Sequence, residues 1–214
     1  MARLNAPPPW LKPLAHLLAA LPGLWLLAGW AELIWIDPAS LRLSAEPVAH
    51  THNVLGLQAL RLLLATLAMT PLVRLSGWTP LMSLRRLLGL WAFAFATLHL
   101  GFYLAMELDF SLSALWREAL RKPFIFFGLF AFLCLLPLAA TSMRRAIRAL
   151  GGRRWQALHR LAYVAGIAAC IHFVLRVKGF QPEPWIYAGL LILLFGIRLL
   201  PNRKRASRAP ARPA

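Results

Sequence analysis

The sequence predicts an all-α integral membrane protein, a bundle of six membrane-spanning helices. Of its 214 residues, 60% are hydrophobic and only 14% are charged, which suits a membrane protein better than a soluble domain. Six apolar stretches approach the ~20 residues that a helix needs to cross a bilayer. The formal net charge of +17 comes from basic clusters between these stretches, whereas a nucleic-acid-binding domain would spread such residues over a soluble fold. We therefore expect a lipid-embedded bundle and no binding to nucleic acid.

The first three predicted spans are apolar runs with basic borders. The first, Leu14–Ile36, is too long for the apolar core of a signal peptide, so we interpret it as a retained helix. The second, Asn53–Val73, ends just before a basic residue. The third, Leu87–Leu108, begins directly after Arg85 and Arg86. Basic residues mark cytoplasmic connections, so the segment between the second and third spans is expected inside the cell.

The last three predicted spans begin at proline or tryptophan. The fourth, Phe124–Ala140, and the sixth, Trp185–Leu200, each follow a proline, which a first helical turn tolerates because its N–H has no partner there. The fifth, Trp155–Leu175, starts at an aromatic residue of the kind found at membrane interfaces. The fourth and sixth spans are short, so their ends are set less firmly by the apolar pattern.

The distribution of charge predicts the orientation. With both termini in the cytoplasm, most of the 24 basic residues fall inside and all seven acidic residues fall outside. The inside basic residues are Arg3, Lys12, Arg74, Arg85, Arg86, Arg144, Arg145, Arg148, Arg153, Arg154, Arg160 and those of the tail. We therefore expect a cytoplasmic N-terminal segment at 1–13, a membrane domain at 14–200, and a basic, disordered cytoplasmic tail at 201–214, drawn to anionic lipid. This predicts a multi-pass protein of a bacterial inner membrane.

Two histidines fall at the same depth on different spans. His99 lies 13 residues past Arg86 and His172 lies 13 residues past His159, so each is about 20 Å from the cytoplasmic edge, in the outer half of the bilayer. Ionisable residues are costly there and are functional candidates by default. Two imidazoles at one depth, with no carboxylate nearby, indicate the axial ligands of a haem between the third and fifth spans. Because the chain has no C-x-x-C-H motif, such a haem is held non-covalently, as in b-type cytochromes.

Small residues surround both histidines on their helix faces, which gives room for a flat macrocycle. They are Ala92 and Ala96 near His99, and Ala165, Ala168 and Ala169 near His172. Ordinary small-residue helix packing explains the alanines but not the histidines. Arg176, one turn beyond His172, is placed to pair with a haem propionate; an interfacial arginine without a ligand is an equally good interpretation.

The remaining histidines are harder to interpret. His159 lies some 140° around an ideal helix from the face of His172, unless a bulge or helix end intervenes. It is therefore a candidate ligand for a second haem or for another cofactor. We expect His16 at the cytoplasmic interface and His50 and His52 in the outer loop before the second span, with interfacial or solvated roles. His52 is also a candidate for a quinone site at the outer face.

Two motifs give the chain a resemblance to a known family. They are Arg85-Arg86-Leu87-Leu88-Gly89-Leu90 at the start of the third span, which contains His99, and Arg154-Trp155-x-x-Leu158-His159-Arg160-Leu161-x-Tyr163, followed by His172. The sequence resembles the MsrQ (YedZ) family along essentially its whole length. That family is the haem-binding membrane subunit of the periplasmic methionine sulfoxide reductase system, and it belongs with the ferric-reductase-like transmembrane domains.

The resemblance implies haem b, an associated FMN, and electron delivery to the periplasmic molybdopterin subunit MsrP. By position, the family's haem histidines correspond to His99, His172 and His159. The chain lacks the fourth histidine of the related oxidases and agrees with the MsrQ pattern. The subunit is then expected to transfer electrons and not to reduce the sulfoxide itself.

The sequence also limits the electron donor. No G-x-G-x-x-G motif follows a strand, and no soluble stretch is long enough for a flavin or nicotinamide domain. Electrons are therefore expected from the quinone pool or from a separate cytoplasmic flavin reductase. Arg85 and Arg86, with the other inner arginines, could hold a flavin phosphate or dock an acidic partner, although their role in setting topology explains them equally well. The alternatives are a ferric, metal or oxygen reductase of the same fold and a cofactor-free scaffold or permease.

Overall fold

The computed structural model describes residues 6–200, which form helices and no strand. The predicted tail at 201–214 and the first five residues lie outside the described residues. The elements are α1 (Leu11–Trp35), α2 (Pro47–Ser76), the 3-10 helix η2 (Thr79–Leu84), α3 (Arg85–Glu107), α4 (Leu112–Arg121), α5 (Pro123–Ala140), α6 (Arg144–Leu150), α7 (Gly152–Leu158), α8 (Leu161–Arg176) and α9 (Pro182–Leu199).

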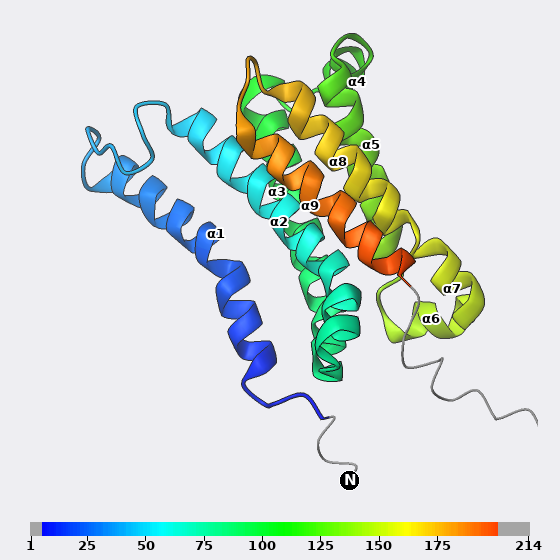
Figure 1. The fold of residues 1–214 in the computed structure, drawn as a ribbon. Coiled ribbons are helices and arrows are strands. Elements are labelled where there is room, and N and C mark those ends of the chain that lie inside the picture. Colours follow the sequence, from blue (N-terminus) through cyan, green and yellow to red (C-terminus); the bar gives the residue numbers. More distant parts are fainter. Residues whose placement is uncertain (1–5, 201–214) are drawn as a thin grey trace, which may run out of the picture.

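Six helical segments are long and apolar enough to cross a membrane, which confirms the prediction of an all-α bundle with six spans. They are α1, α2, η2 with α3, α5, α7 with α8, and α9. The short helices α6 and α7 lie at one end of the bundle and α4 lies at the other (Figure 1). We name the first the arginine-rich end, because it carries Arg74, Arg85, Arg86 and the arginines of α6 and α7, and the second the α4 end.

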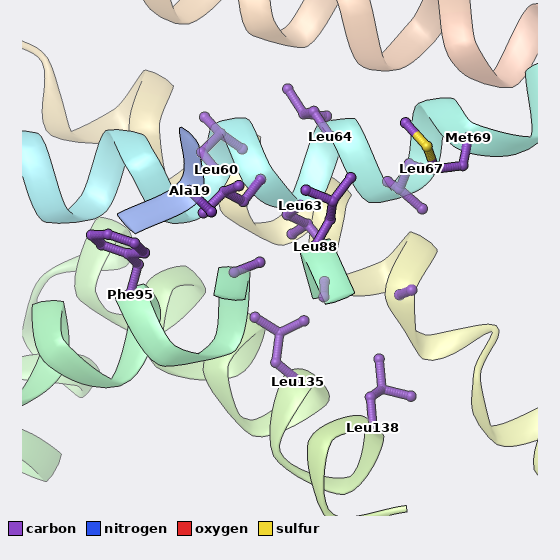
Figure 2. Close-up of a cluster of buried hydrophobic side chains, with 14 of the residues drawn as sticks. Ala19, Leu60, Leu63, Leu64, Leu67, Met69, Leu88, Phe95, Leu135 and Leu138 are labelled. Carbon is purple, nitrogen blue, oxygen red and sulfur yellow. The ribbon is translucent and has the colours of Figure 1, made fainter. Parts of the chain in front are cut away.

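The interior of the bundle is built around α2, which is the most buried of the spans. α2 packs mainly against α3, and α5 packs mainly against α8. Leu63 and Leu67 of α2 belong to the same buried hydrophobic cluster as Phe95 of α3 and Leu135 of α5 (Figure 2). Leu67 is fully buried and Phe95 is 1% exposed. Among helices in lipid, such close van der Waals packing replaces the hydrophobic driving force as the source of association.

The second span is longer than the sequence predicts. α2 begins at Pro47, where proline suits the first helical turn, and not at Asn53. The prediction that His50 and His52 lie in an outer loop is therefore wrong, because both are helical. Hydropathy does not detect the first helical turns of α2, before Asn53, because their polar residues resemble those of a loop. In the structure these turns continue into the apolar run as one helix.

The fifth span consists of two helices rather than one. α7 ends at Leu158 and α8 begins at Leu161, with His159 and Arg160 in the turn between them. Three backbone hydrogen bonds around this turn span three residues instead of four, from Arg160 to Ala157, Ala162 to His159 and Tyr163 to Arg160. Such bonds tighten the helix locally. The ideal rotation that separates His159 from the face of His172 therefore does not apply.

The chain has a further helix at the α4 end that the apolar pattern does not detect. α4 is only ten residues long and carries charged residues, so it falls below the length of a span. Ser111 caps it, accepting a hydrogen bond from the Ala114 N–H at 3.2 Å, as Ser commonly does at a helix start. Its buried face, Leu115 and Ala119, packs with Ile125 at the start of α5. α4 therefore closes the end of the bundle between α3 and α5.

A proline in α2 is compensated by an arginine from α9. Pro71 has no N–H, so the carbonyl of Leu67 loses its usual partner four residues along the helix. Arg198 donates a hydrogen bond to that carbonyl and another to the Tyr163 hydroxyl. Because every backbone polar group within a bilayer needs a partner, this contact joins α2, α8 and α9 near the arginine-rich end.

Arg198→Met is expected to destabilise the protein by about 1 kcal/mol, since the buried Leu67 carbonyl then loses its donor. The measurement is thermal or denaturant unfolding in detergent. In a Pro71→Ala background the helix supplies its own N–H, so the same substitution is expected to cost less. An equal cost in both backgrounds would contradict the compensation and assign the effect to Tyr163.

Candidate haem site

A cavity of about 490 Å³ lies between α2, α3, α5 and α8 and extends toward the α4 end. This volume is within the range of about 300–1,000 Å³ that is usual for ligand and cofactor sites. Its wall is mostly apolar, with leucines and phenylalanines from all four helices. The polar side chains on it include three histidines and several residues at the rim. They are His52, His99, His172, Asn53, Tyr103, Glu107, Arg176, Gln181 and Glu183.

The structure brings His99 of α3 and His172 of α8 together across this cavity. Their ring centroids are 6.3 Å apart and the ring planes make an angle of 78°. A bond between a metal and an imidazole nitrogen is about 2 Å long, so this spacing leaves room for one metal ion between the two rings. Both rings are partly buried.

Backbone carbonyls fix the chemical state of both imidazoles. The Nδ1 of His99 lies 3.1 Å from the carbonyl oxygen of His52, and the Nδ1 of His172 lies 2.6 Å from that of Phe124. A carbonyl oxygen only accepts, so each Nδ1 donates its proton and each Nε2 keeps a free lone pair. Neither Nε2 forms a hydrogen bond within the described part of the chain. Metal-binding histidines are held in this way by a second hydrogen bond.

Two glycines make the close approach to these rings possible. A Cβ atom at Gly56 of α2 would lie 3.0 Å from Cε1 of His99, and one at Gly128 of α5 would lie 2.7 Å from Nδ1 of His172. A larger residue at Gly128 would therefore collide with the His172 ring, and one at Gly56 would press closely against the His99 ring. The sequence offered a signal for both, because an isolated glycine within a helical apolar run often marks a close approach.

The alanines that the sequence places near the histidines divide into two groups. Ala96 and Ala169 line the cavity, as expected. Ala92, Ala165 and Ala168 are at most 3% exposed and do not line it. The expectation that all five give room to a macrocycle is therefore wrong for these three. They pack between helices, because the faces of α3 and α8 that carry them turn toward neighbouring helices.

Arg176 lies at the rim of the cavity, at the end of α8. It donates a hydrogen bond to the side-chain oxygen of Asn53 in α2. Among the described residues it has no carboxylate partner within ion-pair distance. A guanidinium with an amide partner keeps its positive charge uncompensated, so it remains available to a carboxylate at the cavity mouth.

His52, which the sequence offers only as a candidate for a quinone site, lies on the wall of the cavity beside His99. Its ring centroid lies 5.2 Å from that of His99 and 5.1 Å from that of Phe102. Its Nε2 is buried and has no hydrogen-bond partner among the described residues. His52 and Gly56 are one turn apart and share a face of α2. That spacing was the available signal, but it is visible only once the helix is known to begin at Pro47.

The inner candidates do not meet at this cavity. His159 stacks on Trp155, with ring centroids 3.8 Å apart, and its Nδ1 lies 3.1 Å from the Trp155 carbonyl oxygen. Arg85 lies within electrostatic range of His159 and Arg198. Arg86, its neighbour in sequence, instead lines a separate pocket toward α1. The two arginines therefore serve different surroundings and do not form a single site.

Comparison with known proteins agrees with this architecture. The model of the family described as "Ferric reductase like transmembrane component" matches residues 55–170. The protein-methionine-sulfoxide reductase heme-binding subunit MsrQ of Rhodospirillum rubrum is 43% identical over 171 residues, which cover 79% of this chain and 82% of that protein. With six segments able to cross a membrane, the chain is a multi-pass protein of the bacterial inner membrane. The chain belongs to the MsrQ family of ferric-reductase-like membrane proteins.

Proposed function

We propose that this chain is a b-type cytochrome subunit of the inner membrane. It passes electrons from a quinol or a cytoplasmic flavin reductase to the periplasmic molybdopterin subunit MsrP, which repairs oxidised methionine in proteins. The observation that carries the proposal is the pair His99 and His172, 6.3 Å apart with both Nδ1 atoms on backbone carbonyls. Family membership supports a role in membrane electron transfer.

The residues of the cavity fit a haem. His99 and His172 present two unprotonated Nε2 atoms, and Gly56 and Gly128 leave space beside their rings. Arg176 would neutralise a propionate at the rim. A bound haem would supply one-electron chemistry at its iron, tuned by axial ligands and burial. If His99 and His172 both held the iron, no coordination position would be open to oxygen, which favours electron transfer over oxygen binding as the main task.

FMN is the second cofactor in this proposal, at the arginine-rich end. The basic residues there support it, because arginine matches the geometry of phosphate groups. His159 is the candidate ligand for a further haem or a contact of the flavin. Haem and flavin per polypeptide, measured in the wild type and in His159→Ala, decide its role. A haem ratio that falls from two to one assigns ligation to His159, and an unchanged ratio of one excludes it.

The experiment that tests the function follows the reoxidation of the reduced protein. Dithionite-reduced protein is expected to show a b-type haem spectrum and to be reoxidised rapidly by MsrP with methionine sulfoxide present. MsrP without sulfoxide is the control, since it can accept electrons only once. Rapid reoxidation by ferric chelates or oxygen, with none by MsrP, would favour a metal or oxygen reductase. A spectrum without a haem band would favour a cofactor-free scaffold or permease.

A further inference from the structure

The short helix α4 carries an apolar stripe that the rest of residues 6–200 leaves uncovered. Leu115 and Ala119 are buried and pack at the start of α5. Leu112, Trp116 and Leu120, by contrast, are between 59% and 70% exposed. These three residues follow one another at intervals of four, so they share one face of the helix. We call them the α4 stripe.

The α4 stripe widens the apolar side of the helix beyond what the bundle covers. At about 100° per residue, the stripe lies directly beside the buried pair Leu115 and Ala119, and together they form an apolar arc of about 140°. Arg117 and Arg121 lie further around the helix, beyond the stripe. A wide apolar arc with tryptophan and leucine, next to basic residues, is typical of a helix that lies in a membrane interface.

The connection between α4 and α5 places α4 at the membrane surface. α5 has 18 residues, which make about 27 Å of helix, and the hydrocarbon core that it crosses is about 30 Å thick. Its first residue, Pro123, must therefore lie at the edge of that core. Only Lys122 separates Pro123 from the end of α4. The end of α4 that carries Leu120 and Arg121 is consequently at the level of the lipid headgroups.

Exposed tryptophans on two other spans occur on the same side of the membrane. Successive spans run in opposite directions, so the end of α1 and the start of α9 lie on the side of α4 (Figure 1). Trp35 at the end of α1 is 79% exposed, and Trp185 in the first turn of α9 is 58% exposed. Tryptophan concentrates at membrane–water interfaces. Trp116 therefore fits a belt of interfacial aromatics around this end of the bundle.

The arginines of α4 match an anionic lipid surface. Among residues 6–200 neither Arg117 nor Arg121 forms an ion pair, whereas Glu118 is paired with Lys122. An arginine can lay its apolar stem along the stripe and place its guanidinium among lipid phosphates. We propose that α4 is an interfacial anchor. Its stripe enters the boundary between headgroups and acyl chains of the adjacent leaflet, and Arg117 and Arg121 bind phosphates of anionic phospholipids.

This anchor connects the bilayer to the cavity of His99 and His172. Leu115 and Ile125, where α4 packs against α5, both line that cavity. α4 thus has lipid on one face and the cavity wall on the neighbouring face, so the bilayer holds in place the helix that closes the cavity at the α4 end. The lipid contact itself does not depend on whether the cavity holds a haem.

The test uses the full-length protein in lipid nanodiscs, with a nitroxide label at one position of α4 at a time. Leu112→Cys, Trp116→Cys and Leu120→Cys place the label on the stripe, and Ser113→Cys is the matched control on the exposed polar side. Both natural cysteines are buried, and the labelled wild type measures their background. Oxygen concentrates in lipid and a nickel chelate in water, so the ratio of their collision rates measures depth. Circular dichroism reports whether each variant is folded.

We expect the ratio of oxygen to nickel collisions to be several-fold higher at the three stripe positions than at position 113. Equal ratios at all four positions would overturn the proposed insertion into lipid. Protection of the stripe from both reagents would mean that a protein surface, such as a second copy of this chain, covers it. That result would also overturn the lipid anchor.

A second comparison tests the arginines. The label of Trp116→Cys should lie deeper in nanodiscs that contain phosphatidylglycerol than in those of phosphatidylcholine alone, and Arg117→Gln together with Arg121→Gln should remove this difference. Lys178→Gln is the control, because it removes an exposed cation that follows α8 at the same end but lies outside α4. No difference between the lipids in the parent protein, or one that survives the double arginine change, would contradict phosphate binding by these arginines.

Discussion

Replacing His99 or His172 with alanine is expected to abolish haem retention and the b-type absorption band. Each substitution removes one of the two imidazoles that line the cavity with ring centroids 6.3 Å apart, so the remaining imidazole loses its counterpart. The haem site would then depend on a single ligand and apolar contacts. The measurement is haem per polypeptide in purified protein, with the reduced-minus-oxidised spectrum.

Two other histidines of α2 serve as controls for this result. His50 does not line the cavity, so His50→Ala should retain the wild-type haem content. His52 contributes a backbone carbonyl to the His99 ring, and alanine keeps that carbonyl, so His52→Ala should also retain haem. Wild-type haem content in His99→Ala would rule out the proposed pair. Loss of haem in His52→Ala, with retention in His99→Ala, would make His52 the partner of His172.

Gly128→Ala is expected to weaken haem retention by about 10–100-fold, the range seen when a residue that orients a ligand is changed. The new methyl group would lie 2.7 Å from Nδ1 of His172, so the ring must move off the Phe124 carbonyl that fixes its tautomer. Gly56→Ala should act in the same direction on His99 with a smaller effect, because its contact is 3.0 Å. The measurement is haem loss to a competing haem-binding protein over time.

The matched control is Gly101→Ala on α3, the helix that carries His99. A Cβ atom there meets nothing within 4 Å, and alanine is the better helix former by about 1 kcal/mol. It should therefore retain haem as the wild type does and unfold no more easily. If Gly101→Ala and Gly128→Ala lose haem equally, the close approach to His172 is not the cause.

Most of the fold follows from local sequence. Apolar length alone locates the six spans, because a helix must cover the thickness of the bilayer with apolar side chains. The prediction of helices from apolar length fails for two helical segments that are short or polar. The polar turn after Pro47 is indistinguishable from a loop by hydropathy, and α4 is too short and too charged to be detected as a span.

For the site, the sequence by itself identified the histidines within apolar spans as the candidate functional residues. Histidines in an apolar run are costly, and equal spacing from the basic borders puts His99 and His172 at one depth whatever the packing. It did not determine what surrounds them. The carbonyls of His52 and Phe124 and the glycines at 56 and 128 come from α2 and α5. Their meeting depends on how each helix is rotated about its own axis.

The different surroundings of Arg85 and Arg86 likewise depend on helix rotation, which the sequence does not determine. In sequence they form one basic pair that sets topology, and nothing local assigns them different roles. In the structure one lies near α8 and α9 and the other faces α1, because successive residues on a helix point about 100° apart. The sequence by itself thus determined the spans, their depth and the unusual histidines. Only tertiary packing decided which side chains share a cavity, since helix rotation and neighbour choice depend on contacts between segments far apart in the chain.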